Sequence, residues 1–238
     1  MTLYADGKNF SADSQLVKLL VGLLQKDIYV AIVTAAGYAG QPERYEHRLS
    51  GLLEGFKKVD IPPEKLEKFF VLGGECNYLF KYDSKSHRLV SVPNDDYQSL
   101  QVKAWNSDKI ALNAFLDVAH ENIIDCSIQL GLSDQITIIR KELALGIVPR
   151  EGVTLSRECL DEFALSTQRV LKHYRLVQER SNPKSPKIPF CAFNGGSDVW
   201  VDIGNKLIGV QLLQEYLQAN GHETLHVGDQ VSFVLTHT

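Results

Sequence analysis

The order of helix, buried strand and small-residue loop near the start of the chain constrains its fold most. Residues 14–26 carry apolar side chains at helical spacing, and Ser14 is placed to cap the helix. Residues 28–33 then form a run rich in β-branched side chains, typical of a strand buried on both faces of a parallel sheet. The run ends in a small-residue loop over 34–37. This succession predicts an open α/β sheet, in which ligands bind beyond the carboxyl ends of the strands.

The residues that follow are expected to add further helices and strands to this α/β domain. Apolar side chains recur on one face of a charged segment, a Pro-Pro pair interrupts it, and two apolar runs flank a polar turn. The elements expected here are, in order, a helix over 42–58, a short helix starting at Pro62 and Pro63, a core element over 69–74, and a β-hairpin over 78–92.

From about residue 100 the pattern changes to long amphipathic helices, which indicates an inserted domain. We predict a core part over 1–97, an inserted α+β cap over 98–192, and the cap end with the return to the core over 193–238. The elements expected after residue 100 are helices over 107–130 and 156–180, a short strand over 135–140, a Pro- and Lys-rich loop over 181–189, a strand over 198–203, a helix over 206–219, and a strand over 224–229 that ends in an acidic loop.

Composition narrows the class of protein. The 238 residues include 44% hydrophobic and 23% charged side chains, as in ordinary globular domains. A formal net charge of −4 argues against a broad nucleic-acid interface. The four cysteines are far apart and show no Cys-x-x-Cys spacing, which favours reduced thiols over a zinc site or a disulfide framework. No signal-peptide pattern or membrane-length apolar run occurs, so we expect a cytoplasmic protein without a membrane partner.

Two residues are placed to meet a phosphate. Thr34 follows the first expected strand, where its hydroxyl and neighbouring backbone N–H groups suit the oxygens of a phosphoryl group. A threonine that only caps a strand is the alternative. Lys206 stands at an expected helix start, where the helix dipole disfavours a cation unless an anion lies nearby. A solvated surface lysine explains it equally well.

Two acidic residues add further candidates. Asp198 and Trp200 alternate with Val199 and Val201, so their side chains leave one face of a strand and suit a purine base. Simple packing of the tryptophan is the alternative. Asp229 ends the last expected strand, and a carboxylate there suits Mg²⁺, although a turn aspartate would have the same sequence.

Four segments together resemble a known family. They are residues 1–7, 31–38, 194–206 and 225–230, and they are similar to the corresponding segments of the IMP-specific 5′-nucleotidases of fungi and apicomplexans. The likeness spans essentially the whole chain. It implies a haloacid dehalogenase-like, Rossmann-type α/β core with an inserted cap, and Mg²⁺-dependent conversion of IMP to inosine and phosphate.

The resemblance also implies roles for individual residues. Asp6, Thr34, Asp198 and Lys206 would bind IMP, and Asp229 would hold Mg²⁺. It further implies a homo-oligomer and an ATP effector acting through a region that precedes this chain.

The same resemblance makes the ends of the chain unusual. If Thr2 is the threonine of the family's Asp-x-Asp-x-Thr loop, the nucleophilic Asp and the acid/base Asp would lie upstream of Met1. The first core strand would be absent, and the segment after Gln230 leaves the family pattern. We therefore expect the chain as written to contain no catalytic residue and to turn over little IMP. The alternatives are a non-catalytic nucleotide-binding remnant or subunit, a phosphatase of other phosphate monoesters, and a chain that does not fold stably.

Overall fold

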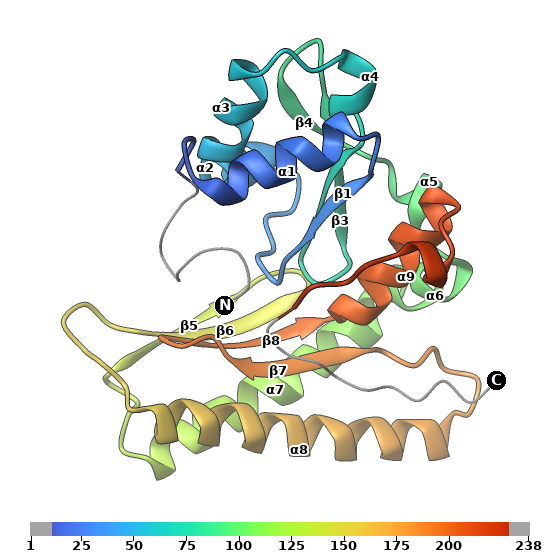
Figure 1. Cartoon of the computed structure of the whole chain (residues 1–238). Helices are drawn as coiled ribbons and strands as arrows, with labels where there is room; N and C mark the ends of the chain where they lie inside the picture. Colours follow the sequence, from blue (N-terminus) through green and yellow to red (C-terminus); the bar gives the residue numbers. More distant parts are fainter. Residues whose placement is uncertain (1–10, 229–238) are drawn as a thin grey trace.

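Two four-stranded sheets form the framework of the molecule. The computed structural model describes residues 11–228. One sheet, with α1–α4 beside it, lies above the other, which rests on α7 and α8, while α5, α6 and α9 lie at one side (Figure 1). The elements are α1 (Gln15–Gln25), β1 (Val30–Val33), α2 (Pro42–Arg48), α3 (Ser50–Lys58), α4 (Pro63–Leu66), β2 (Phe69–Gly73), β3 (Tyr78–Asp83), β4 (Arg88–Ser91), α5 (Asn94–Tyr97), α6 (Leu100–Ser107), α7 (Lys109–Gln129), β5 (Ile136–Arg140), β6 (Ala144–Pro149), α8 (Arg157–Ser181), β7 (Phe190–Asn194), β8 (Val199–Ile203), α9 (Lys206–Leu217) and a 3₁₀ turn, η1 (Gly221–Glu223).

The first sheet has the strand order β1-β2-β3-β4. β1 pairs parallel with β2, and the other two pairings are antiparallel. Side chains of β2 alternate between two hydrophobic cores: Phe69 and Val71 pack toward α1–α4, whereas Phe70 and Leu72 pack toward α9 and belong to the core that includes the second sheet. β2 is therefore buried on both faces and joins the two cores.

The helix predicted over 14–26 is confirmed as α1, and its local sequence explains why it forms. The Ser14 hydroxyl accepts a hydrogen bond from the Val17 backbone N–H at 3.2 Å, which caps the helix. Val17, Val21 and Leu24 are the buried face. The predicted hairpin is also confirmed, since β3 and β4 pair antiparallel around a polar turn.

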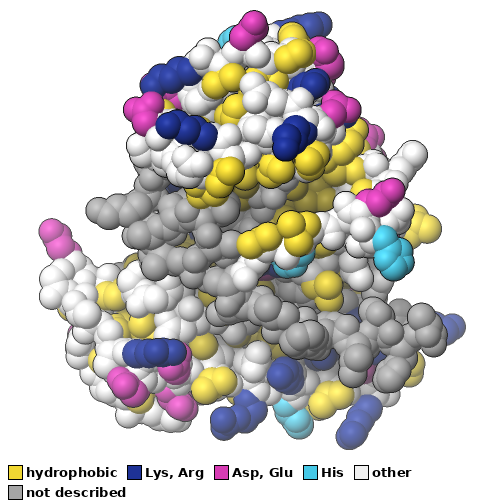
Figure 2. Space-filling model, in the orientation of Figure 1, with side chains coloured by type: hydrophobic (Ala, Val, Ile, Leu, Met, Phe, Trp, Pro, Cys, Tyr) yellow, Lys and Arg dark blue, Asp and Glu magenta, His cyan; other side chains and the backbone are white. Residues whose placement is uncertain are grey.

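The prediction that residues 28–33 are buried on both faces is wrong. The strand begins at Val30 and is an edge strand among the described residues, so only one neighbour shields it. Leu19, Ile28 and Tyr29 are exposed, the tyrosine by 51%. Figure 2 shows hydrophobic side chains gathered on the flank of the upper part of the molecule, below a region rich in charged side chains.

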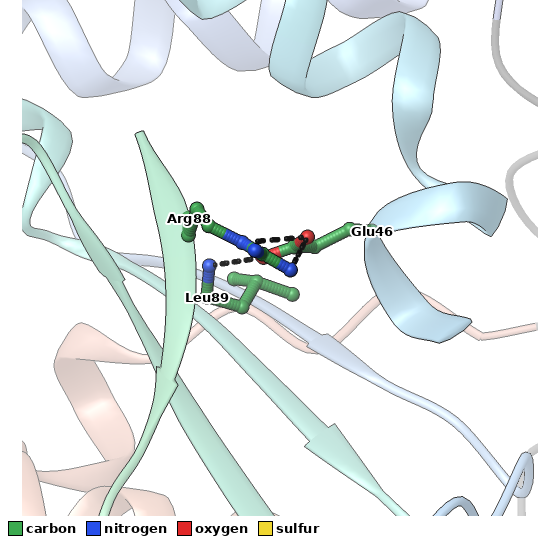
Figure 3. Close-up of polar contacts among 3 residues, drawn as sticks. All are labelled: Glu46, Arg88 and Leu89. Atoms are coloured by element: carbon green, nitrogen blue, oxygen red, sulfur yellow. Dashed lines mark hydrogen bonds and ion pairs between the residues drawn. The ribbon is translucent and has the colours of Figure 1, made fainter. Parts of the chain in front are cut away.

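The single helix expected over 42–58 is two helices, because the chain breaks at Leu49, which is buried with φ −101° and ψ 12°. The first of them, α2, is tied to the edge strand β4. The Glu46 carboxylate accepts the Leu89 backbone N–H at 2.8 Å and pairs with the Arg88 guanidinium at 3.0 Å (Figure 3).

The second sheet has the strand order β5-β6-β8-β7, and all its pairings are antiparallel. The long helices α7 and α8 cover one face, as Figure 1 shows, and both were predicted within a few residues. Leu116, Phe163, Val199 and Val201 are among the fully buried side chains of this core.

Sequence patterns missed strand β6. Its Gly146 lies opposite Trp200 in the register, and a side chain there would meet the indole at 2.5 Å. A glycine inside a strand weakens the sequence signal, but here it lets the indole lie against β6.

The strand predicted over 224–229 is also absent from its described part. Residues 224–228 pair with neither sheet, and Leu225 is 87% exposed, because alternating apolar residues form a strand only where an edge accepts them. The second sheet takes strands from both sides of residue 192; the domain boundaries stay a prediction. Within residues 11–228 no helix is both long and apolar enough to cross a membrane.

Candidate functional site

The predicted site residues that are described lie where the two sheets meet. Four segments form this region, which we call the junction: the loop 34–38 after β1, the turn 74–77 between β2 and β3, the turn 141–143 between β5 and β6, and residues 198–206 along β8 into α9. Contacts between these segments bring together residues more than 100 positions apart.

Asn77 links the two sheets through hydrogen bonds of its side chain. Its side-chain amide donates hydrogen bonds to the backbone oxygens of Gly74 and Ile203, both at 2.7 Å. Gly204 lies directly against this turn with φ +97°, and a side chain there would meet the Cys76 sulfur at 2.4 Å. A buried amide with backbone partners on both sheets fixes the geometry of the junction.

Thr34 ends β1 and contacts the turn after β2. Its N–H donates to Leu72 O at 2.9 Å, and its carbonyl accepts the Glu75 N–H at 3.1 Å. The hydroxyl accepts the Ala36 N–H at 3.2 Å, which is the local cap that the alternative interpretation expects. The hydroxyl proton has no acceptor within residues 11–228, so the same group can still donate to a ligand oxygen.

Lys206 is the first residue of α9, as predicted, and Asn205 caps the helix by accepting the Ile208 N–H at 2.9 Å. The Lys206 ammonium is exposed. Burial raises the pKa of the Glu75 carboxyl, while the Lys206 ammonium, the Lys206 backbone N–H and the Cys191 thiol partly offset that rise in pKa. Thr34 and Lys206 therefore approach the same residue, Glu75, from different sheets.

Sequence reasoning missed a buried acidic pair at the centre of the junction. Glu75 and Asp202 are 4% and 5% exposed, and their carboxylates lie with the Cys191 sulfur within 4.8 Å of one another. Burial, followed by the charge of Glu75, raises the pKa of Asp202 to about 8, while Lys141 and Lys206 act in the opposite direction. Two carboxyl groups this close and this buried favour holding a proton between them at neutral pH.

The donor set of this cluster does not fit Mg²⁺. Magnesium takes hard oxygen ligands in an octahedral, largely hydrated arrangement, whereas this group includes a thiol. Burial also raises the pKa of Cys191, so the sulfur stays protonated. We therefore assign no magnesium site to Glu75, Cys191 and Asp202, and the predicted metal ligand, Asp229, lies outside the described residues.

Asp198 and Trp200 leave the same face of β8, as the alternation predicts. The Trp200 indole N–H donates to Asp198 Oδ2 at 2.9 Å. Gly195 makes room for this carboxylate, since a side chain at that position would meet Asp198 Oδ1. The Asn194-Gly-Gly sequence is thus a hairpin turn that shapes the Asp198 site.

Lys141 extends from the second sheet to the loop after β1. Its ammonium donates to Gly37 O at 3.4 Å and lies 4.2 Å from the Trp200 ring centre and 5.7 Å from that of Tyr38. Arg44 stacks on Tyr38 at 4.1 Å. No sequence motif marks Lys141; its position depends on how the second sheet folds over the first.

Of the five predicted residues, three lie in the segments that form the junction. Thr34 and Lys206 lie next to Glu75, whereas Asp198 lies at the opposite end of β8 from Lys206. Asp6 and Asp229 lie outside the described residues. A separate cavity of about 270 Å³ between α6, α8 and α9 contains none of the five.

Comparisons with known proteins identify the family of this chain. The family model of IMP-specific 5′-nucleotidase matches residues 1–237. "IMP-specific 5′-nucleotidase 1" of Yarrowia lipolytica is 41% identical over 97% of this chain and 53% of its own length, and that of Schizosaccharomyces pombe is 40% identical over 97% and 54%. The chain thus spans about half the length of these curated relatives.

Solved structures give the same result for the fold. An IMP-bound mutant of Plasmodium falciparum IMP-nucleotidase aligns with a TM-score of 0.77 and 33% identity, over 93% of this chain and 55% of that one. The ATP-bound form of that protein aligns with a TM-score of 0.74, over 92% and 47%. These matches confirm the predicted α/β class and its haloacid dehalogenase-like character. The family match, the sequence identity to the fungal proteins and the shared fold together show that this chain belongs to the IMP-specific 5′-nucleotidase family.

Proposed function

We propose that this chain binds IMP at the junction and forms the substrate-binding part of a phosphoric monoester hydrolase. The reaction of such an enzyme consumes IMP and water and yields inosine and phosphate. Support comes from the family, from the names of the fungal relatives, and from the IMP-bound Plasmodium protein of the same fold.

One observation carries the proposal: Thr34 and the start of α9 at Lys206 both lie next to Glu75. The Glu75 N–H donates to the Thr34 carbonyl, and the Lys206 ammonium and backbone N–H act on the Glu75 carboxylate. A residue with a free hydroxyl donor, an ammonium and the N-terminus of a twelve-residue helix thus lie on either side of Glu75. Such a set suits the oxygens of a phosphate monoester.

The remaining predicted residues complete the proposal. Asp198, beside Trp200, would contact the nucleoside, Asp6 would contact the nucleotide, and Asp229 would hold Mg²⁺. When bound, Mg²⁺ would neutralise charge on the phosphoryl group. The residues that form and break the P–O bonds through an aspartyl-phosphate are not assigned within this chain, so we derive no catalytic step from it.

We also propose a cytoplasmic location for the protein. Its four cysteines are free, which suits the reducing cytoplasm. An ATP effector and a homo-oligomer remain predictions; an ATP-bound form is known for the Plasmodium protein.

Calorimetric titration of the 238-residue chain with IMP, with and without Mg²⁺, tests the proposal. We expect saturable binding, weakened about ten- to hundredfold by Lys206→Met because a hydrogen bond to a charged group is lost. Lys184→Met, which changes an exposed lysine away from the junction, should leave the affinity unchanged. Absence of IMP binding by the folded chain would contradict the proposal, and a phosphate-release assay on the same sample would measure its turnover.

A further inference from the structure

Lys141 is the one cation that crosses from the turn of the second sheet to the loop of the first within the described junction. The side chain is partly buried and lies near the rings of Tyr38, in the loop after β1, and Trp200, in β8 of the second sheet. Any ligand that reaches from the Thr34 loop toward Asp198 would therefore meet its ammonium.

The hydrogen-bonding capacity of Lys141 is largely unused. An ammonium has three N–H donors, and here one of them makes a long contact of 3.4 Å to Gly37 O. Within residues 11–228 no carboxylate lies within 4.0 Å of Nζ. Burial lowers the pKa of Lys141, the charge of Asp202 opposes this shift, and Arg44 and Arg48 add to it. An oxygen acceptor at this point would offset more of the cost of burying the cation.

Asp198 supplies an acceptor on the same side of the junction. One carboxylate oxygen accepts the indole N–H of Trp200, and this contact fixes the orientation of the side chain. Lys141 and Asp198 contact the same side chain, because the Lys141 ammonium lies 4.2 Å from the Trp200 ring centre and Asp198 accepts the N–H of that ring. Lys141 thus presents donors over the face of the Trp200 indole, and Asp198 presents an acceptor at the edge of the same ring.

The purine of IMP has the complementary pattern. Hypoxanthine carries a carbonyl oxygen at C6, which accepts hydrogen bonds, next to a protonated N1, which donates one. Adenine reverses both groups, with a donating amino group at C6 and an accepting N1. A donor beside an acceptor therefore distinguishes the two bases at adjacent atoms.

We propose that Lys141 is a specificity-determining residue that donates to the C6 oxygen of hypoxanthine while Asp198 accepts the N1–H. This inference rests on the proposed binding of IMP at the junction. Tyr38 and Trp200 would contact the purine on either side of the ammonium. AMP would leave Lys141 facing an amino group and Asp198 facing a lone pair, and unpaired buried polar groups are the strongest means by which a site rejects an analogue.

The test compares IMP with AMP, because they share ribose and phosphate and differ only in the base. Calorimetric titrations of the full chain would use the wild type, Lys141→Met, Lys141→Arg and the control Lys184→Met. Lys141→Met keeps the length and apolar stem of the side chain and removes its donors. We expect it to weaken IMP binding about tenfold or more, to leave AMP binding nearly unchanged, and so to abolish most of the preference for IMP. Lys141→Arg keeps donors and should retain part of that preference, and thermal melting would confirm that each variant is folded.

Each outcome decides between the two proposals. A Lys141→Met variant that binds IMP but keeps the wild-type preference over AMP would overturn the role of Lys141 and leave IMP binding intact. Equal weakening of both nucleotides would also overturn it, because the lysine would then contact a part that IMP and AMP share. A wild-type chain that binds neither nucleotide would overturn the proposed function, and this inference would fail with it.

Discussion

The two sheets use their faces differently. In the first sheet, β2 is buried on both sides, with Phe69 and Val71 in one core and Phe70 and Leu72 in the other. In the second sheet, β8 buries Val199, Val201 and Ile203 against its helices and turns Asp198, Trp200 and Asp202 toward the junction.

This difference separates structural from functional positions. A strand that fills two cores has no face left for polar side chains, so β2 contributes to the junction only through the turn that follows it. One face of β8 is turned away from its helices toward the junction, and Asp198, Trp200 and Asp202 occupy it at a spacing of two residues. The first sheet thus provides a rigid edge, and the second provides side chains that can contact a ligand.

Substitution at Gly204, where the two sheets touch, should reduce the stability of the fold more than the other substitutions that we propose for stability measurements. Gly204→Ala would place a methyl group against the Cys76 sulfur and force alanine into a left-handed conformation. We expect the free energy of unfolding to fall by about 2–4 kcal/mol, measured by denaturant titration.

Gly152→Ala is the matched control, since Gly152 has φ +79° but no atoms near a new side chain. It should cost about 1 kcal/mol, from backbone strain alone. Equal losses in the two variants would show that the sheets are not in tight contact at Gly204.

The next prediction concerns how stability depends on pH through the buried carboxyl of Asp202 on β8. Its pKa is raised from 3.8 to about 8, so the folded protein keeps a proton that the unfolded chain loses above pH 4. Stability from this group is therefore present below pH 4 and lost as pH rises to about 8. Asp202→Asn cannot ionise, so it should lose less stability than the wild type between pH 4 and pH 8.5 and be the more stable protein at pH 8.5, with little difference at pH 4.

Thermal melting across this pH range would measure the effect. Asp134→Asn, at an exposed loop position, should leave the pH profile unchanged. Parallel profiles for wild type and Asp202→Asn would contradict the assignment of a buried protonated carboxyl at the junction.

A smaller loss of stability is expected from substitutions at β4, the edge strand of the first sheet farthest from β1. Glu46 accepts the Leu89 N–H and pairs with Arg88 (Figure 3). Glu46→Ala should reduce the free energy of unfolding by about 1 kcal/mol, because it removes the backbone partner of Leu89 as well as the ion pair. Arg88→Met removes only the exposed ion pair and should cost less; the reverse order in a denaturant titration would refute this explanation.

Sequence patterns predicted the elements that depend on local chemistry. Ser14 caps its helix, the hairpin of β3 and β4 forms around a polar turn, and α9 begins at Lys206, because capping and periodicity are properties of neighbouring residues. The alternation along β8 likewise placed Asp198 and Trp200 on one face.

The residues that were missed depend on contacts between distant segments. Lys141 meets Gly37 across 104 positions, and Asn77 meets Ile203 across 126. Glu75 becomes a candidate only when α9 packs against its turn. No local pattern records these contacts, and for the same reason the segment 224–229 resembled a strand without an edge to join.

Hydrogen–deuterium exchange of the 238-residue chain with and without saturating IMP tests the central claim most directly. If the substrate binds where the two sheets meet, peptides covering 34–38, 74–77 and 198–206 should exchange more slowly with IMP, whereas those covering α4 should not change. Protection confined to the lining of the cavity between α6, α8 and α9, with none at the junction, would contradict the account.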